Sequence, residues 1–205
     1  MWHVLKKTVL DTWDELLYAI IYNFIWVVGT LLFVTWPFVT FGLFYTAKDI
    51  SDGKGIKFKK FFAYGRQYWK AAYIWGGINL GVLVLLGLNL NFYAGINTQW
   101  AGLMQLFFIA VTLLWSLTQI MALGVYPRLL EPSFKLALRN SAVIAARYPL
   151  MMLLLLAVII LMAALSLVFS AVILVLPFSF VAIFANNAVG AVLKREEERQ
   201  EEADK

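Results

Sequence analysis

The sequence predicts an all-α, polytopic transmembrane helical bundle with five spans and additional amphipathic helices at the membrane interface. Four apolar blocks carry no charged side chain, and they run over residues 17–47, 71–90, 100–126 and 149–193. A bilayer core about 30 Å thick is crossed by roughly 20 apolar residues in a helix, and each block reaches that length. Of the 205 residues, 62% are hydrophobic and only 14% are charged, against about 25% charged residues in soluble domains.

The first block, residues 17–47, is too short for two full crossings and a turn, so we expect one long span bent near Pro37. The next two blocks give spans over about 71–90 and 100–126. The alternative for the first block is a re-entrant segment, which enters and leaves on one side and puts the N-terminus inside.

The fourth block is long enough for two spans. At about 1.5 Å per residue, a helix from Pro149 to Leu193 would be about 68 Å long, twice the hydrocarbon thickness. Small polar residues from Ser166 to Ser170 interrupt the apolar run and predict a turn there. The spans are then about 149–166 and 171–193, with Pro177 in the first half of the last span, where a kink is expected.

The distribution of Lys and Arg predicts the orientation. Residues 48–70 and 128–147 are rich in Lys and Arg, whereas the linkers at 91–99 and 166–170 contain none. Because cytoplasmic loops carry the excess of basic residues, both basic segments and the C-terminus are expected to face the cytoplasm. Five spans then put the N-terminus outside.

Three segments outside the spans have helical periodicity and are predicted to lie in the membrane interface, over about 2–16, 56–69 and 133–147. The apolar stripe of the first includes Trp2, Val9 and Trp13, and that of the second includes Phe58 and Phe61. Residues 1–195 are thus expected to form a single transmembrane domain. The charged cytoplasmic tail, 196–205, is predicted to be a fraying helix end or disordered.

The spans lack the groups that most chemistry requires. They contain no charged residue, the chain has no cysteine, and its single histidine is His3 in the N-terminal segment. We therefore expect no catalytic residue, no cofactor and no metal site. The net charge of +5 is better explained by anionic lipid headgroups than by nucleic acid. The residues predicted to contact such lipids are Lys57, Lys59, Lys60 and Arg66.

Five amides inside the apolar blocks are candidates for a polar cavity that binds an uncharged, hydroxyl-rich ligand such as a sugar. The same amides could instead bond between helices, as amides in hydrocarbon often do. They are Asn23, Asn79, Gln119, Asn186 and Asn187.

A rigid turn follows the third span at residues 126–132. Two prolines bracket Arg128 and Glu131, which are spaced to pair on one face. This turn is either a structural elbow or a docking site for a partner.

Several motifs resemble the YesL-like family of bacterial integral membrane proteins, whose function is undetermined. In order along the chain they are DTWDELL, NFIW, PFVTFG, FKKFFAYGRQYWKAA, YPRLLE, LALRNSAVIA and ANNAV. The resemblance implies five spans in the bacterial plasma membrane. It also implies a connection with sugar uptake, because genes of the family often lie near genes for sugar uptake and polysaccharide breakdown.

Three functions follow as hypotheses. The first is a non-catalytic accessory or regulatory component associated with carbohydrate uptake, with a membrane protein such as a sugar transporter as partner. The alternatives are a carrier or pore for a small neutral solute and a lipid-organising membrane protein. A polar cavity near the membrane midplane would favour the carrier, and a closed apolar bundle with an exposed apolar groove would favour the accessory protein.

Overall fold

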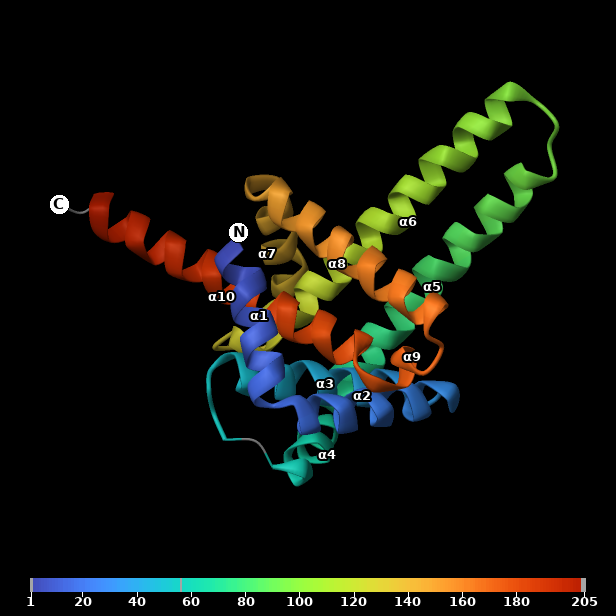
Figure 1. Ribbon diagram of the computed structural model, residues 1–205. Helices are drawn as coiled ribbons and strands as arrows, with labels where there is room; N and C mark the ends of the chain where they lie inside the picture. Colours follow the sequence, from blue (N-terminus) through green and yellow to red (C-terminus); the bar gives the residue numbers. More distant parts are fainter. Residues whose placement is uncertain (1, 56, 204–205) are drawn as a thin grey trace.

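The computed structural model describes residues 2–55 and 57–203, and every regular element in these ranges is helical (Figure 1). The elements in chain order are α1 (Trp2–Asp14), α2 (Leu16–Leu31), α3 (Trp36–Ser51), α4 (Phe58–Gln67), α5 (Trp69–Ala94), α6 (Gln99–Val125), the 3-10 turn η1 (Tyr126–Arg128), α7 (Phe134–Arg147), α8 (Pro149–Val168), α9 (Val172–Val175) and α10 (Pro177–Ala203).

Four helices of the described chain are long and apolar enough to cross a membrane: α5, α6 with η1, α8 and α10. A fifth span arises only if α1 and α2 count as one, and these two helices meet at a bend of 91°. The protein is therefore an all-helical membrane protein with four to five candidate spans.

The expected single span over residues 17–47 is wrong, because the first block folds back on itself. Phe33 has a φ of 53°, a left-handed conformation that reverses the chain between α2 and α3. The two helices then lie together, and Trp26 Nε1 donates a hydrogen bond to Thr40 Oγ1 at 3.0 Å. Pro37 falls in the first turn of α3, where its missing N–H costs nothing, so it starts a helix and does not bend a span.

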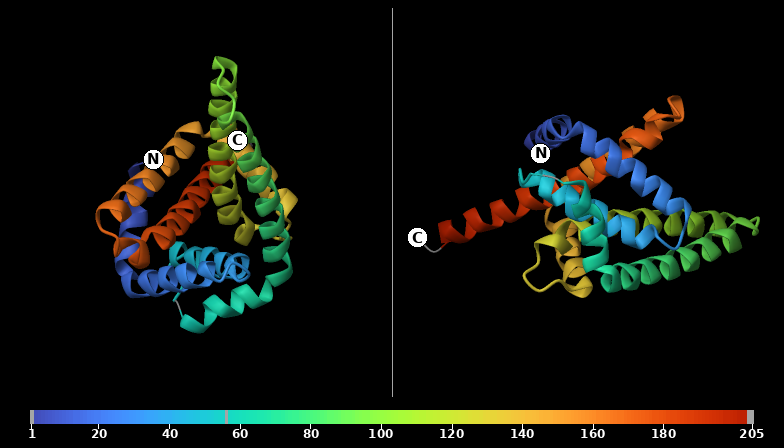
Figure 2. Two further views of the ribbon diagram at one scale, coloured as in Figure 1. Left: turned by 90° about the vertical axis from the view of Figure 1, so that its right-hand side faces the viewer. Right: turned by 90° about the horizontal axis from the view of Figure 1, so that it is seen from below.

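Helices α5 and α6 form a long hairpin that projects away from the other helices (Figures 1 and 2). The expected spans over 71–90 and 100–126 lie within these two helices, except that residue 126 belongs to η1. Thr98 caps the start of α6 and its hydroxyl accepts a hydrogen bond from the Ala101 amide at 3.3 Å. Large apolar side chains such as Leu85, Phe92 and Leu106 are exposed along the hairpin.

The expected kink at Pro177 is also wrong. After α8 the chain turns at residues 169–171, forms the short α9, and begins α10 at Pro177 itself. Proline suits the first helical position because its fixed φ is already helical and no intrahelical N–H is lost. Helix α10 continues through the expected tail as far as Ala203, and residues 204–205 of that tail lie outside the described residues.

Helices α3 and α10 carry the most buried residues and form the centre of the structure. Small residues let neighbouring helices approach α10 closely. A Cβ atom on Gly124 of α6 would lie 3.1 Å from the Ala185 carbonyl oxygen. This close packing of backbones is typical of helices within membranes.

The helix expected over 56–69 is α4, and it packs on the protein with its apolar face. Phe61 is fully buried, its ring stacks on Tyr22 at 5.2 Å, and Gly65 lies against the Phe38 ring. Residue 56 lies outside the described residues. Of the aromatic residues on the face predicted to enter the lipid, Phe61 belongs to the protein core, whereas Phe58, Phe62 and Trp69 remain exposed.

The other two amphipathic segments form α1 and α7. Helix α1 buries its polar side, including Thr8 and Thr12, and leaves Trp2, Val9 and Trp13 exposed. Helix α7 packs beside α6 through a buried side that includes Ile144. The exposed apolar stripe of α1 is free to face lipid, as expected for an interfacial helix.

Candidate functional site

The five candidate amides lie at three separate places, so the expected common polar cavity is not formed. Asn23 joins α2 to the start of α10. Its Oδ1 accepts hydrogen bonds from the backbone amides of Phe178 at 2.8 Å and Ser179 at 3.2 Å. Its Nδ2 donates to the Ile173 carbonyl at 2.9 Å. Because the first amides of a helix lack intrahelical partners, Asn23 serves as a helix cap supplied from another helix.

Asn79 and Gln119 form a second cluster between α5 and α6. Gln119 Oε1 accepts hydrogen bonds from Trp75 Nε1 at 3.1 Å and from Asn79 Nδ2 at 3.3 Å. Asn79 Oδ1 accepts a third from Trp115 Nε1 at 3.1 Å. The buried Nε2 of Gln119, however, has no hydrogen-bond partner among the described residues. This cluster joins the base of the α5–α6 hairpin and leaves one donor unused.

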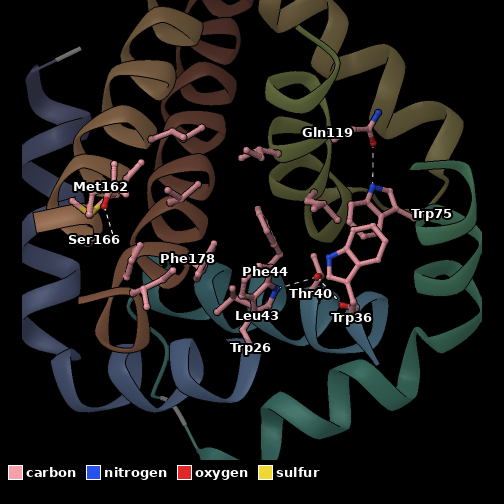
Figure 3. Close-up of a pocket in the computed structure, with 18 residues that line it drawn as sticks. Trp26, Trp36, Thr40, Leu43, Phe44, Trp75, Gln119, Met162, Ser166 and Phe178 are labelled. Carbon is pink, nitrogen blue, oxygen red and sulfur yellow. Dashed lines mark hydrogen bonds between the residues drawn. The ribbon is translucent and has the colours of Figure 1, made fainter. Parts of the chain in front are cut away.

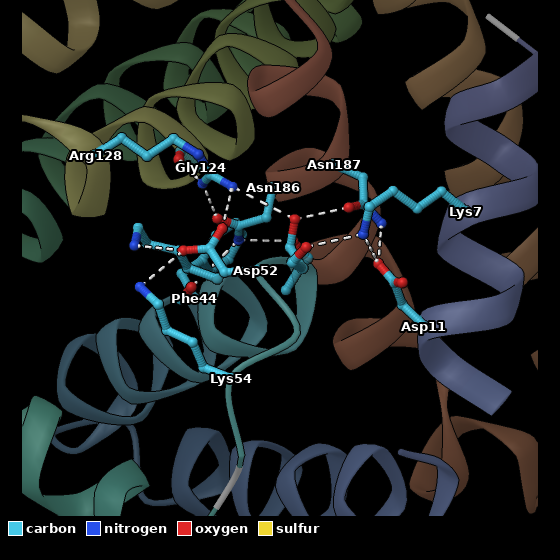
Figure 4. A network of polar contacts seen from close by, with 12 residues as sticks. Lys7, Asp11, Phe44, Asp52, Lys54, Gly124, Arg128, Asn186 and Asn187 are labelled. Atoms are coloured by element: carbon cyan, nitrogen blue, oxygen red, sulfur yellow. Dashed lines mark hydrogen bonds and ion pairs between the residues drawn. The ribbon is translucent and has the colours of Figure 1, made fainter. Parts of the chain in front are cut away.

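Asn186 and Asn187 belong to a polar network that links α1, α3, η1 and α10 (Figure 4). Asn187 Oδ1 accepts from Ser51 Oγ at 2.7 Å, and its Nδ2 donates to Asp11 Oδ2 at 2.9 Å. Asn186 Nδ2 donates to the Phe44 carbonyl at 3.2 Å. Adjacent amides on α10 thus bind different neighbours, and both are buried.

Arg128 extends into this network and does not pair with Glu131 as its spacing suggests. Its Nη1 donates to the Gly124 carbonyl at 3.0 Å and to Asn186 Oδ1, and its side chain is only 10% exposed. Asp52 lies 3.8 Å from Nη2. Glu131 is exposed. Arg128 is therefore committed inside the protein, which contradicts a docking role for the pair.

Asp52 sits at the edge of the network and carries further ion pairs. Lys48 Nζ lies 2.8 Å and Lys54 Nζ 3.2 Å from Asp52 Oδ2. Partial burial acts to raise the pKa of Asp52, but the hydrogen bonds from the two lysines outweigh it and hold the pKa below its ordinary value. Asp52 therefore remains ionised under neutral conditions.

The four basic residues predicted to contact lipid divide into two groups. Lys60 pairs with the buried Asp49 at 3.1 Å, so its charge is balanced inside the protein. Lys57, Lys59 and Arg66 are exposed. These three remain the better candidates for contact with anionic headgroups.

An apolar cavity with a volume of about 590 Å³ lies among the helices (Figure 3). It lies between α2, α3, α5, α6, α8, α9 and α10, and of the five candidate amides only Gln119 borders it. Its described lining contains no charged side chain. The lining residues are Trp26, Trp36, Thr40, Leu43, Phe44, Trp75, Gln119, Ile120, Leu123, Ile159, Met162, Ala163, Ser166, Leu167, Ile173, Pro177, Phe178 and Val181.

The sequence gives no direct sign of this cavity, because its walls come from seven helices. A pair of glycines, by contrast, is visible in the sequence. Gly77 and Gly81 of α5 are exposed, and a Cβ atom on either would meet nothing within 4 Å. Glycines four residues apart in an apolar helix are a recognised packing motif for transmembrane helices.

Comparison with protein-family models, with curated proteins and with solved structures finds no significant match to the chain.

Proposed function

We propose that the protein is a non-catalytic integral membrane protein that acts as an accessory or regulatory component of another membrane protein in carbohydrate uptake. The observation that carries this proposal is the use of the intramembrane amides. Four of the five bond to neighbouring helices and do not line the apolar cavity. A carrier for a sugar needs a hydrated path lined by hydrogen-bonding groups, so this arrangement favours the accessory protein.

The surface we propose for the partner is the exposed face of α5 around Gly77 and Gly81. Small residues let a second helix approach closely, and in lipid this close packing is a main source of helix association. Both positions have open space beside them. The proposed partner is a transmembrane helix of another protein, and the resemblance to the YesL-like family points to a sugar transporter.

We further propose the bacterial plasma membrane as the location, with the C-terminus in the cytoplasm. The outside N-terminus was inferred from a single first span, and the fold-back of α2 and α3 removes that argument. Lys7 Nζ of α1 donates to the Ser51 carbonyl at 2.8 Å, so α1 lies at the end of α3 that leads into the first basic segment. We therefore favour the re-entrant alternative, with both termini inside.

Thiol labelling tests this orientation, because the chain contains no cysteine. In intact cells, a membrane-impermeant reagent should label Gly95→Cys and Val168→Cys but not Gly55→Cys or His3→Cys. Labelling at position 3 alone would restore the outside N-terminus. Labelling at position 55 would overturn the whole orientation.

Affinity purification from membranes tests the accessory function. Gly77→Leu and Gly81→Leu should reduce recovery of a co-purifying transporter, whereas Gly87→Leu is the matched control, because it also has open space but lies elsewhere on α5. Equal recovery with all three variants would reject this surface. Saturable sugar uptake by proteoliposomes containing this protein alone would instead establish the carrier.

A lipid-organising function is the second candidate, and it rests on the exposed basic residues of α4. Replacing Lys57 and Lys59 with Gln should reduce the anionic lipid that co-purifies, since each basic residue near such a surface contributes about 1 kcal/mol. Lys60→Gln is the control, because Lys60 already pairs with Asp49. Retention of the lipid by the double variant would reject this candidate.

A further inference from the structure

We infer that a basic pocket at one end of the spans binds the phosphate and glycerol region of an anionic phospholipid. The pocket has a volume of about 250 Å³ and lies between the end of α6, η1, α7, Tyr148 and α10. It shares no described lining residue with the larger apolar cavity. Unlike that cavity it is lined by charged as well as apolar side chains, and basic pockets between transmembrane helices bind the headgroups of anionic lipids.

The pocket lies at the level where the spans pass from apolar to charged sequence. The candidate span of α6 and η1 ends at Arg128, and that of α8 begins at Pro149. On α10, Leu193 lines the pocket and Lys194 begins the charged part of the helix. Lipid phosphates occupy this same level, at the edge of the hydrocarbon.

Two arginines line the pocket, and each has a donor left for a ligand. The hydrogen bonds of Arg128 all use Nη1 or Nη2, so its Nε has no partner among the described residues, and Nε is not closed off from the surface. The Arg147 side chain is 61% exposed, and its ion pair with Glu196 uses Nη1 alone, at 3.0 Å. Asn140, which is half-buried, adds an amide to the lining.

The ion pairs beside the pocket leave an excess of positive charge, because five cations share two carboxylates (Figure 4). Asp52 is within ion-pair distance of Arg128, Lys48 and Lys54, and Glu196 is within that distance of Arg147 and Arg199. A phosphodiester is ionised at neutral pH, and its oxygens match the planar donors of a guanidinium. The charge and the donor type therefore both favour a phosphate group.

The walls of the pocket favour a lipid over a free phosphate ester. Most of the other lining residues are aliphatic, and Val143 and Leu193 among them are each 43% exposed. Free phosphate gains nothing from such walls, whereas the glycerol and the first carbons of the acyl chains would bury apolar surface against them. The chains would then continue past the exposed side chain of Leu150 at the start of α8.

Glu196 also lines the pocket and would compete with a bound phosphate for Arg147. Its Oε1 accepts a hydrogen bond from the Tyr148 hydroxyl at 2.6 Å, and its Oε2 accepts one from Arg147. Removing the charge of Glu196 should therefore strengthen phosphate binding, whereas removing the charge of Arg147 should weaken it.

The test is photo-crosslinking in phosphatidylcholine vesicles that contain a trace of photoreactive phosphatidylglycerol. The reactive group lies near the ester end of one acyl chain, and peptide mapping should find crosslinks at pocket residues such as Val143 and Val192. Unlabelled phosphatidylglycerol should displace the probe from these residues. Diacylglycerol with the same chains, which lacks the phosphate, and glycerol 3-phosphate, which lacks the chains, should not displace it at the same concentration.

Arg147→Gln should reduce these crosslinks about fivefold, the effect of one basic residue near an anionic surface, and Glu196→Gln should increase them. The matched control is Arg139→Gln, because Arg139 is an exposed arginine on the same helix that does not line the pocket. Val143→Trp should block the pocket. Ala142→Trp should not, because Ala142 is exposed beside it but is not part of the lining.

Equal displacement by diacylglycerol and by phosphatidylglycerol would overturn the phosphate contact. Displacement by glycerol 3-phosphate would assign the site to a free phosphate ester and overturn the lipid. Equal losses for Arg147→Gln and Arg139→Gln would overturn the pocket as the binding site. The crosslinks should persist when Lys57 and Lys59 are replaced with Gln, so the result is independent of the lipid-organising function proposed for α4.

Discussion

Replacing Asn23 with Leu should destabilise the protein by removing the cap on α10. The substitution nearly preserves volume, so the main effect is the loss of three hydrogen bonds. Two backbone amides at the start of α10 and the Ile173 carbonyl would lose their partner. Asn23 is fully buried, so water cannot replace it.

The magnitude follows from the groups left without partners. Loss of a helix cap costs about 0.5–2 kcal/mol, and a buried unsatisfied group costs about 1–3 kcal/mol. The Ser179 contact is the longest of the three, at 3.2 Å, so we expect a total of about 2–4 kcal/mol. For a chain of this size the midpoint of thermal unfolding should fall by about 4–16 °C.

Thermal unfolding of the purified protein in detergent measures this effect. The control is Asn89→Leu, which removes an amide that bonds only to its own helix, at the Leu85 carbonyl, and should shift the midpoint little. Asn23→Asp should be intermediate, because it keeps an acceptor near the positive end of the helix dipole but loses the donor. A shift for Asn23→Leu no larger than that for Asn89→Leu would refute the capping function.

The remaining predictions concern the network and the packing of α5. Arg128→Met should lower the free energy of unfolding by about 1.5–3 kcal/mol, the range for a hydrogen bond to a charged group, whereas Glu131→Gln should leave it unchanged. Equal losses for the two variants in denaturation would indicate that Arg128 pairs with Glu131 after all. Gly76→Ala should destabilise by about 1–3 kcal/mol through overpacking, because its Cβ would lie 2.4 Å from Pro37 Cγ. A Cβ atom at Gly77 would meet open space, so Gly77→Ala should be neutral or stabilising by up to about 1 kcal/mol. Thermal unfolding of the two glycine variants compares these effects. Because the pKa of Asp52 is lowered in the folded protein, its stabilisation should be present above about pH 4 and be lost as pH falls further. In Asp52→Asn, this loss of stability in acid should be absent from the free energy of unfolding measured against pH. The same loss in the variant as in the original protein would contradict the ion pairs of Asp52.

The helical membrane class was predictable because it depends on composition and on long runs without charge. The two spans of the α5–α6 hairpin were located for the same reason, since charged or polar linkers flank each run. The fold of the first block was not predictable, because an apolar run of residues 17–47 is compatible both with one bent helix and with two short ones. The left-handed conformation at Phe33, which decides between them, has no signature in a residue type that rarely adopts it.

The candidate site was predictable only as a set of residue types. Polar residues in apolar blocks are easily found, but their partners lie far away in sequence, as the contacts of Asn23 with α9 and α10 show. The same holds for Arg128, whose neighbour in sequence suggested a pair with Glu131. In the structure the stronger partners are Gly124 and Asn186, because a buried guanidinium requires acceptors within the protein.

The positions of the amides also explain how a chain so rich in apolar residues specifies one arrangement. Between helices in lipid, burial of apolar surface gives little preference for one neighbour over another, because lipid is equally apolar. Each amide cluster instead joins particular helices: Asn23 joins α2 to α10, Gln119 joins α6 to α5, and Asn187 joins α10 to α1 and α3. Three clusters of this kind define the packing of the central helices. Because these amides already bond between helices, we expect their replacement to weaken the packing of the bundle first.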